Sequence, residues 1–437
     1  MVEHRKPIKV NEAIERVMQY TIKGSLQRVP IEESYGHFLG EDLVADHHVP
    51  PFDRSPYDGF ALRSKDTNEA TRNAPLQFEV IGEIGAGSVF EREVGEMQAV
   101  RIMTGAQIPK GCDAVVMLEL VQEMEREGKS LIQIKRSFKT GDNISFAGED
   151  TKKGAVLAPK GTYINPGMVA LLATFGYKNV PVGTKPKIGI IATGSELLDI
   201  DEPLQPGKIR NSNAFMVYSQ IQRAGGEPVY FGQFSDEFHT CYEQVKAALE
   251  QVDLLLTTGG VSVGDYDYLP AIYEKMGANV LFNKVGMRPG SVTTVAEKDG
   301  KLLFGLSGNP SACYVGFELF TRPIIRTFLH SYQPVMKKEV AVLGADFSKP
   351  NPFDRFVRGH LSFEDGNLVA TPVGLDKSSV VSSLGAANIL ILLPGGTRGY
   401  ERGMKVSVLL LEDQEGTKLE QFFHEASTDK RRKRYDG

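Results

Sequence analysis

The sequence predicts an α/β and β multidomain protein built around a central, doubly wound α/β domain with a largely parallel sheet. Between residues 182 and 331, short apolar runs alternate with helical patterns, which is typical of βαβ crossovers. Residues 46–146 and 332–411 show alternating runs separated by Gly, Pro and Asp clusters, which favour β structure. With 437 residues, the chain is long enough for about two to four domains.

The segments outside the α/β domain follow simple patterns. We expect an amphipathic helix at residues 10–24, because Val10, Ile14 and Val17 share one face and Gly24 stops the helix. Three strands are predicted in the β-rich stretch, at residues 76–81, 100–103 and 114–118. A further helix is predicted at residues 168–175, just before the α/β domain.

Within the α/β domain, strand and helix patterns follow one another in order. The predicted strands cover residues 188–192, 228–231, 254–258, 280–282 and 302–306. The predicted helices cover residues 214–224, 238–249, 268–276 and 312–328. After His330 the helical period ends, and strands at 339–343, 357–361, 368–371, 389–393 and 406–411 predict a small C-terminal β-barrel-like domain.

Composition excludes several classes of function. Fifty Lys and Arg stand against 55 Asp and Glu, a net charge of −5, so we expect no nucleic-acid partner and no attraction to anionic membranes. No apolar stretch is long enough to predict a membrane span, and the N-terminus does not resemble a signal peptide. Cys112, Cys241 and Cys313 are widely separated, which favours a reducing compartment and predicts a cytoplasmic protein.

Four polar loops follow strands of the predicted sheet. They cover residues 193–196, 259–267, 284–291 and 307–311. Because ligands bind beyond the carboxyl ends of parallel strands, we expect these loops to share one edge. Each loop by itself is best interpreted as a glycine-rich turn, but four at one edge favour a binding site.

The expected edge combines anion-binding and acidic groups. Gly and Ser in the loops expose backbone N–H groups that suit phosphate oxygens, and Lys284 and Arg288 add positive charge. Glu196, Asp236 and Asp267 would repel an anionic ligand unless a cation lies between them. The sequence therefore predicts a phosphate group bridged by Mg²⁺.

Three other segments carry weaker signals. Residues 51–61, which contain Asp58, and residues 101–106, which contain Thr104, are typical of turns by themselves. Residues 353–359 and 378–383 offer Arg and hydroxyl donors without nearby acids. Such donors could hold a tetrahedral oxyanion, although surface Arg and Ser are also common.

Taken together, these segments resemble the molybdopterin molybdenumtransferases, the family of MoeA and the gephyrin E domain. The resemblance extends from the opening helix to about residue 411. Its most specific stretches are Ser55-Pro56-Tyr57-Asp58-Gly59-Phe60-Ala61, residues 101–106, residues 259–267 and Gly305-Leu306-Ser307-Gly308-Asn309-Pro310.

The resemblance implies an elongated homodimer of four-domain subunits. Residues 1–45 together with 147–181 would form a discontinuous N-terminal domain, with the β-rich residues 46–146 inserted into it. Residues 182–331 would be the molybdopterin-binding α/β domain and 332–411 the C-terminal β domain, followed by a polar, basic tail at 412–437.

The resemblance also implies a reaction in molybdenum cofactor biosynthesis. Molybdate is inserted into adenylylated molybdopterin, with Mg²⁺-dependent release of AMP. Partners would be small-molecule substrates and a second copy of the chain, with contacts to the preceding adenylyltransferase and to acceptor molybdoenzymes.

Site residues carried over from the family fall into three groups. The catalytic residues would be Asp58, Thr104, Lys284 and Asp267, and the metal-organising residues Glu196, Asp236 and Asp267. The pterin nucleotide would lie against Gly259, Gly260, Ser262 and Gly264. Molybdate would be held by Arg288, Ser291, Ser311, Arg358 and Ser378, although Ser291 stands where the family often has Lys. Asp58 and Thr104 would reach the site from the other subunit.

Two other functions remain open at this point. One is a molybdopterin adenylyltransferase, because the enzymes of that step share a similar Gly-Gly-x-Ser-x-Gly loop. The β-rich stretch and the C-terminal β domain argue against it. The other is a non-catalytic, gephyrin-like scaffold, against which the presence of Asp267, Lys284 and Arg288 argues.

Overall fold

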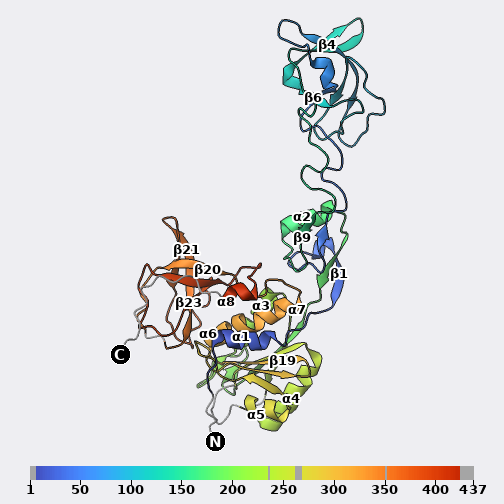
Figure 1. Cartoon of the computed structure of the whole chain (residues 1–437). Coiled ribbons are helices and arrows are strands. Elements are labelled where there is room, and N and C mark those ends of the chain that lie inside the picture. Colours follow the sequence, from blue (N-terminus) through green and yellow to red (C-terminus); the bar gives the residue numbers. More distant parts are fainter. Residues whose placement is uncertain (1–5, 235–236, 261–267, 350–351, 424–437) are drawn as a thin grey trace. The chain divides into compact units, whose positions relative to one another are not determined.

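A computed structural model describes residues 6–234, 237–260, 268–349 and 352–423 of the chain. The chain forms two compact units, one made of Met1–Glu41 with Pro159–Gly437 and the other of Asp42–Ala158 (Figure 1). The finer four-domain division, with boundaries at 45, 146, 181 and 331, stays a prediction. Within the described residues, no helix combines the length and apolar character needed to cross a membrane.

The unit of residues 42–158 is a β structure, as its alternating apolar pattern predicts. Its six-stranded sheet has the order β6-β3-β5-β4-β8-β7. These strands are β3 (Gly59–Leu62), β4 (Leu76–Ile84), β5 (Gln98–Ile102), β6 (Ala114–Met117), β7 (Val121–Arg126) and β8 (Lys129–Ile134). A short pair, β2 (Leu43–Val44) and β9 (Val156–Ala158), lies where the chain enters and leaves the unit. The β7–β8 hairpin is absent from the sequence prediction. β7 is largely exposed, whereas β8 buries Ile132 and Ile134 on one face, an alternation that the sequence analysis missed.

The second unit is built around the predicted α/β sheet, with strand order β14-β11-β15-β19-β18-β16. Its strands are β11 (Lys187–Thr193), β14 (Glu227–Phe234), β15 (Leu254–Thr258), β16 (Asn279–Phe282), β18 (Thr294–Lys298) and β19 (Lys301–Leu306). β11 pairs in parallel with β14 and β15, and β15 pairs in parallel with β19. Only β18 runs against its neighbours in this sheet. The prediction of a largely parallel sheet is confirmed.

Helices cover both faces of this sheet, so it is doubly wound as predicted. The helices are α3 (Ser212–Ala224), α4 (Phe238–Gln251), α5 (Leu269–Lys275), α6 (Pro310–Gly316) and α7 (Arg322–Phe328), with a π-helical turn η4 (Phe317–Thr321) between the last two. Ile190 of β11 packs in one hydrophobic core with Val217 of α3, whereas its neighbour Ile191 packs in a second core with Val245 of α4. Successive residues of a strand point to opposite faces, which explains the two cores.

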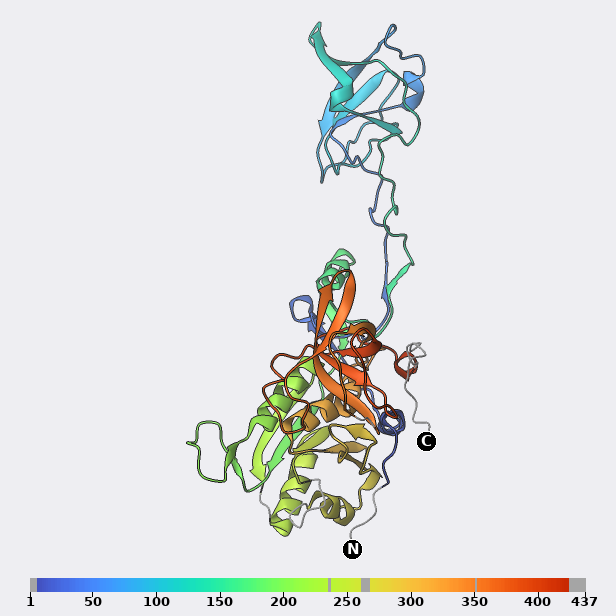
Figure 2. The same ribbon diagram turned by 90° about the vertical axis from the view of Figure 1, so that its left-hand side faces the viewer.

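The C-terminal β domain is a closed five-stranded barrel, drawn in orange in Figure 2. Its strands are β20 (Lys338–Leu343), β21 (Asp354–Glu364), β22 (Asn367–Pro372), β23 (Ile389–Leu393) and β24 (Lys405–Leu410). The order β21-β22-β20-β24-β23 closes because β21 also pairs with β23. A short strand, β17 (Met287–Arg288), joins the barrel by pairing with β21. The sequence predicts a loop where β17 lies, because two residues are too few to show a period.

The N-terminal segment differs from expectation at one helix boundary. α1 (Val10–Met18) buries Val10, Ile14 and Val17 as predicted, but it ends at Met18 rather than near Gly24. The chain instead turns at Tyr20, whose N–H bonds the carbonyl of Val17. Gly24 is needed for a different reason, since a Cβ there would lie 2.3 Å from a ring atom of Phe328.

Residues before and after the β-rich unit meet again. β1 (Leu26–Pro30) pairs antiparallel with β10 (Asn179–Gly183). α2 (Pro166–Thr174) lies between β9 and β10 in the sequence, close to its predicted place. The short elements β12 (Leu197–Leu198), β13 (Ile209–Arg210) and α8 (Leu419–Phe423) complete the described α-helices and strands, and three 3₁₀ turns lie at Ile31–Glu33, Ser64–Thr67 and Leu118–Leu120.

The close packing at Gly59 can be tested by a substitution that changes the stability of the β-rich unit. A Cβ at this position would lie 2.1 Å from the backbone oxygen of Val116 on the neighbouring strand. Backbone cannot retreat cheaply, so we expect Gly59→Ala to lower the free energy of unfolding by about 3 kcal/mol. Urea denaturation checks this value. The matched control is Gly85→Ala, where a Cβ would meet nothing within 4 Å and where we expect a change within about 0.5 kcal/mol. Equal effects of both substitutions would contradict the packing argument.

Candidate functional site

Three of the predicted loops meet at the carboxyl edge of the parallel sheet. The N–H of Gly259, just after β15, donates to the carbonyl of Leu306 at the end of β19, with an N to O distance of 2.9 Å. A Cβ at Gly259 would lie 2.7 Å from the carbonyl oxygen of Thr193, the last residue of β11. The ends of β11, β15 and β19 are therefore in direct contact, as the parallel order requires.

The two glycines after β15 have no room for a side chain. Gly259 has φ of +97° and Gly260 has φ of +67°, both in the left-handed region. A Cβ at Gly260 would approach the hydroxyl oxygen of Thr193 to 3.0 Å. Glycine here leaves the backbone open to close approach by a ligand. The remaining predicted residues of this loop, Ser262, Gly264 and Asp267, lie outside the described residues.

Glu196 is the described member of the predicted metal-organising set. Its side chain is exposed, and its carboxylate folds over Gly194, where a Cβ would lie 2.5 Å from Oε2. The same turn is held by Gln233, whose Nε2 donates to the carbonyl of Gly194 at 2.5 Å. Asp236 lies outside the described residues. Among the residues that are described, no three acidic, His or Cys side chains form a group able to hold a metal ion.

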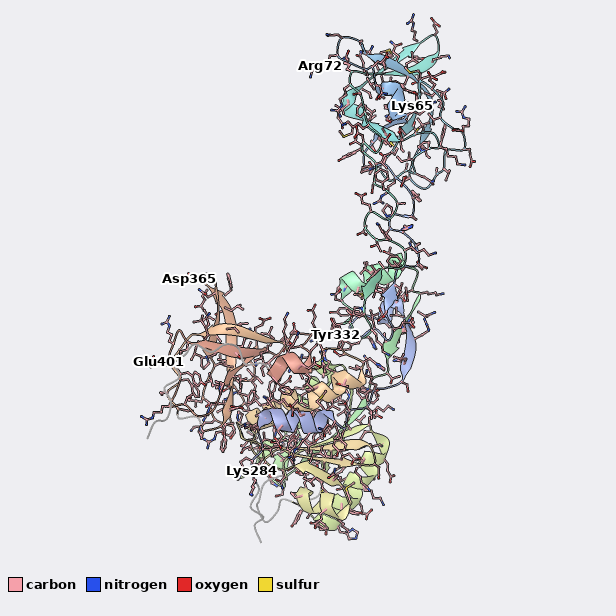
Figure 3. The ribbon with its side chains drawn as sticks, viewed as in Figure 1. Lys65, Arg72, Lys284, Tyr332, Asp365 and Glu401 are labelled. Carbon is pink, nitrogen blue, oxygen red and sulfur yellow. The ribbon has the colours of Figure 1, made fainter. Side chains whose placement is uncertain are left out.

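The loop after β16 lies between the sheet and the barrel. Lys284 is half-buried at the margin of the α/β region (Figure 3), and its carbonyl accepts from the N–H of Ile8 at 3.1 Å. Val285 N–H donates to the carbonyl of Ser291 at 2.9 Å, which closes the loop. Arg288 is exposed, and its backbone pairs with Arg355 in the barrel. Arg288 and Ser291 thus lie on a loop that joins the α/β region to the barrel.

Ser311 connects the first turn of α6 to a loop of the barrel. Its N–H donates to the carbonyl of Ser378 at 3.0 Å, and its hydroxyl donates to the carbonyl of Val380 at 2.7 Å. Ser311 is buried and Ser378 is half-buried. The structure therefore brings together two of the residues predicted to hold an oxyanion.

Arg358 lies in β21 with only 1% of its side chain exposed. Its Nε donates to Ser383 Oγ at 2.9 Å and its Nη2 to the carbonyl of Leu375 at 2.8 Å. Its buried Nη1 has no hydrogen-bond partner among the described residues. Burial holds the pKa of this guanidinium below its ordinary value, an effect that Asp376 opposes.

The expectation that these donors have no nearby acid is wrong. Asp376 Oδ1 lies 3.9 Å from Arg358 Nη1, and its Oδ2 lies 2.5 Å from Arg355 Nη1. Lys349 is a third cation, 3.5 Å from the same carboxylate. The acid is 18 positions from Arg358 in sequence, and the connection between β22 and β23 brings it back beside β21. Its place two residues before Ser378 was the signal that sequence reasoning overlooked.

Asn213 is another residue at the edge that sequence reasoning missed. Its Nδ2 donates to the carbonyl of Gly308, in the loop after β19, at 2.8 Å. Asn213 lies in the first turn of α3, where the pattern indicates only a helix start.

Asp58 and Thr104 are brought together in the β-rich unit. Asp58 Oδ1 accepts from Thr104 N–H at 2.6 Å and from its hydroxyl at 2.7 Å. The antiparallel pairing of Gly59 with Ile102 places the two turns side by side. These hydrogen bonds, the backbone one foremost, hold the pKa of the exposed Asp58 carboxyl below its ordinary value. Asp58 is therefore an ionised group that presents a carboxylate to solvent.

These observations define a multidomain α/β protein in which glycine-rich loops after three strands meet at one edge of the sheet, and in which a β unit carries a carboxylate held by Thr104. Three family profiles cover most of the chain. The MoeA N-terminal region (domains I and II) matches residues 8–176, a probable molybdopterin-binding domain matches 189–327, and the MoeA C-terminal region (domain IV) matches 340–411. The chain belongs to the MoeA family.

Individual relatives agree with the family assignment. A molybdopterin molybdenumtransferase of Bacillus subtilis is 62% identical over 417 residues, covering 95% of this chain and 97% of the relative. One of Staphylococcus epidermidis is 48% identical over 414 residues, covering 94% and 97%. The crystal structure of a molybdopterin biosynthesis MoeA protein of Pyrococcus horikoshii has a TM-score of 0.79 and 33% identity, covering 93% of this chain and 100% of that chain.

The contact between Asp58 and Thr104 predicts a measurable pKa change. Thr104→Val removes the hydroxyl donor but keeps the backbone N–H, so we expect the pKa of Asp58 to rise part of the way to its ordinary value. In the wild type, the hydrogen bonds from Thr104 stabilise the ionised form of the Asp58 carboxyl. This stabilisation is lost when the carboxyl is protonated, as the pH falls through the lowered pKa of Asp58. NMR titration of the Asp58 carboxyl carbon measures both values.

The control for this titration is Thr140→Val in the same unit. Thr140 donates its hydroxyl to Asp113 Oδ2 at 2.6 Å. Burial raises the pKa of Asp113, but its hydrogen bonds outweigh burial and hold the pKa below its ordinary value. We expect this substitution to raise the pKa of Asp113 and to leave that of Asp58 unchanged. An unchanged Asp58 pKa in Thr104→Val would contradict the proposed hydrogen-bond effect.

Proposed function

We propose that this chain is a molybdopterin molybdenumtransferase, which inserts molybdate into adenylylated molybdopterin and releases AMP. The observation that carries the proposal is the contact among the loops that follow β11, β15 and β19, which creates one edge with open backbone. The match to a protein of that name over 95% of this chain supports the same function. Molybdopterin and molybdate are then substrates, and the product is the molybdenum cofactor.

The nucleotide end of the substrate would lie on the loop that begins at Gly259. Gly259 and Gly260 would let a phosphate approach the backbone closely, and Ser262 and Gly264, which follow them in sequence, are proposed to contact the same nucleotide. Lys284 would offset the negative charge that develops on the leaving phosphate when water cleaves the phosphoanhydride. Asp58 and Thr104 would act together, because the hydroxyl and N–H of Thr104 orient the Asp58 carboxylate.

The donor chemistry of the edge fits Mg²⁺. Glu196 supplies an exposed carboxylate, and Asp236 and Asp267 would supply two more. Carboxylate oxygens are the protein ligands that Mg²⁺ prefers, and substrate phosphates commonly complete its coordination. When bound, the ion would neutralise charge on the phosphate oxygens.

Molybdate would be held between the α/β region and the barrel. The proposed donors are Arg288, Ser291, Ser311, Arg358 and Ser378. The buried Nη1 of Arg358 supports this role, because an unsatisfied buried donor is costly unless a ligand accepts from it. The Asp376 carboxylate lowers the local positive charge, which we infer favours release of the bound oxyanion after reaction.

We further propose that the chain acts as a homodimer in the cytoplasm, with contacts to the preceding adenylyltransferase and to acceptor molybdoenzymes. Exposed apolar side chains support a protein interface, among them Ile200, Leu204, Ile209 and Phe215. The chain's three cysteines, all within the described ranges, form no disulfide, which fits a reducing compartment.

The direct test is AMP release from adenylylated molybdopterin by the purified chain, with and without molybdate and Mg²⁺. We expect molybdate to stimulate release and EDTA to stop it. Asp267→Asn should reduce the rate by about 100-fold, because it removes a charge from the metal-organising set. The control is Asp299→Asn, at the opposite end of the strands, which should leave the rate unchanged. Net ATP consumption without AMP release would instead indicate an adenylyltransferase.

A mixing experiment tests whether two copies share a site. Asp58→Asn and Asp267→Asn should each lose nearly all activity alone, because each substitution damages every site of its own homodimer. If Asp58 of one copy serves the α/β edge of the other, random mixed dimers restore about a quarter of the sites. Mass spectrometry should confirm that the two variants exchange subunits. If they do and the mixed sample still shows no regained activity, a shared site is ruled out.

A further inference from the structure

One continuous helix connects the sheet to the barrel. α6, η4 and α7 follow one another without a break from Pro310 to Phe328, and nearly all of their residues are buried. On one side, this helix packs with Ile188 and Leu256 of the sheet in the largest hydrophobic core. Leu409 of the barrel belongs to the same core, so the helix lies between the two structures (Figure 1).

The start of this helix holds one segment of the barrel. Ser311 bonds the carbonyls of Ser378 and Val380 through its N–H and its hydroxyl. The segment that contains them also supplies Ser383, which accepts a hydrogen bond from Arg358. Ser311 therefore fixes the distance between α6 and the donors proposed for molybdate.

The end of the helix holds a second segment, which leaves the barrel after β24. Arg322 donates from Nη1 to the carbonyl of Leu411 at 2.9 Å and from Nη2 to that of Asp413 at 2.5 Å. Arg326 donates from Nη1 to the carbonyl of Gln414 at 2.8 Å. These carbonyls belong to an irregular segment, and the two guanidiniums donate charge-assisted hydrogen bonds to three of them.

A buried carboxylate between these two ends keeps Arg322 in place. Glu318, in η4, has a fully buried side chain. Its Oε2 accepts from Arg322 Nη1 at 3.0 Å, and its Oε1 accepts from Gln220 Nε2 at 2.7 Å and from Arg223 Nη2. Burial alone would raise the pKa of Glu318, yet the two arginines hold it below its ordinary value. Glu318 is therefore ionised and joins α3 to the helix.

We propose that Glu318, acting through Arg322, is a positioning residue that fixes the barrel on the α/β sheet and so sets the distance between Ser311 and the molybdate donors Arg358 and Ser378. This inference rests on the proposed function, because it assigns a purpose to the spacing of those donors. Glu318 itself touches no substrate. Its effect is on the geometry of the oxyanion site, where a displacement of about 1 Å can cost up to 100-fold.

Two variants test the proposal in the full-length chain. Glu318→Gln keeps the shape of the side chain and removes its charge, whereas Arg322→Lys keeps the charge and cannot reach both carbonyls. For each, we expect the KM for molybdate to rise about tenfold while kcat stays within about twofold. Hydrogen exchange of residues 375–383 and 411–417 should become about tenfold faster, with no change in residues 59–134.

The matched control is Glu412→Gln. Glu412 pairs with the same Arg223 at 2.5 Å, but 68% of its side chain is exposed, so its charge should matter little. We expect wild-type KM and exchange rates. If Glu318→Gln fails to fold, as global exchange would reveal, Arg322→Lys decides the question.

The outcomes separate the two proposals. Unchanged exchange and unchanged KM in a folded Glu318→Gln or Arg322→Lys variant would overturn the positioning role. An equal effect of Glu412→Gln would also overturn it, as would a fall in kcat with a constant KM for molybdate. A wild-type chain that releases no AMP would overturn the proposed function instead, while the exchange data still test whether Glu318 fixes the barrel.

Discussion

The parallel pairing of β11, β15 and β19 is the constraint on which the rest of the structure depends. Parallel strands require helical crossovers, and their carboxyl ends must then lie at one edge of the sheet. Residues 194, 259 and 307 are far apart in sequence but directly follow these three strand ends, so pairing alone brings them together. The tight packing of Gly259 against the ends of β11 and β19 shows how closely they meet. Gly259 and Gly260 leave the backbone at this edge open, which suits the phosphate group of the proposed substrate.

The C-terminal barrel must also be attached to the sheet, and the helix from Pro310 to Phe328 provides this attachment. It continues directly from β19, so the element that forms part of the edge also carries the barrel. The polar contacts along it are unusual in a core, because buried charge is costly unless every partner is satisfied. Glu318 itself accepts hydrogen bonds from Arg223, Arg322 and Gln220, whereas Gln220 Oε1 has no hydrogen-bond partner among the described residues. Because buried ion pairs add little net stability, we infer that this network serves to hold one arrangement of the helix and the barrel.

Sequence patterns predicted the parts of this fold that depend on local periodicity. The βαβ alternation, the β texture of residues 46–146 and the C-terminal strands are confirmed, because apolar spacing reports which face of each element is buried. Features that depend on distant partners were missed. Asp376 is beside Arg358 only because the chain returns between β22 and β23. The roles of Asp58 and Thr104 were predicted from the family resemblance, because the two segments by themselves are typical of ordinary turns.

The most direct test of the proposed site is a crystal structure of the chain with AMP, Mg²⁺ and molybdate. We expect the AMP phosphate against Gly259 and Gly260, with molybdate between Ser311 and Arg358. The opposite end of the strands offers a competing cavity of about 260 Å³, whose lining includes Lys246, Lys298 and Lys301. AMP bound in that cavity, with the edge after β15 empty, would contradict the assignment of the site.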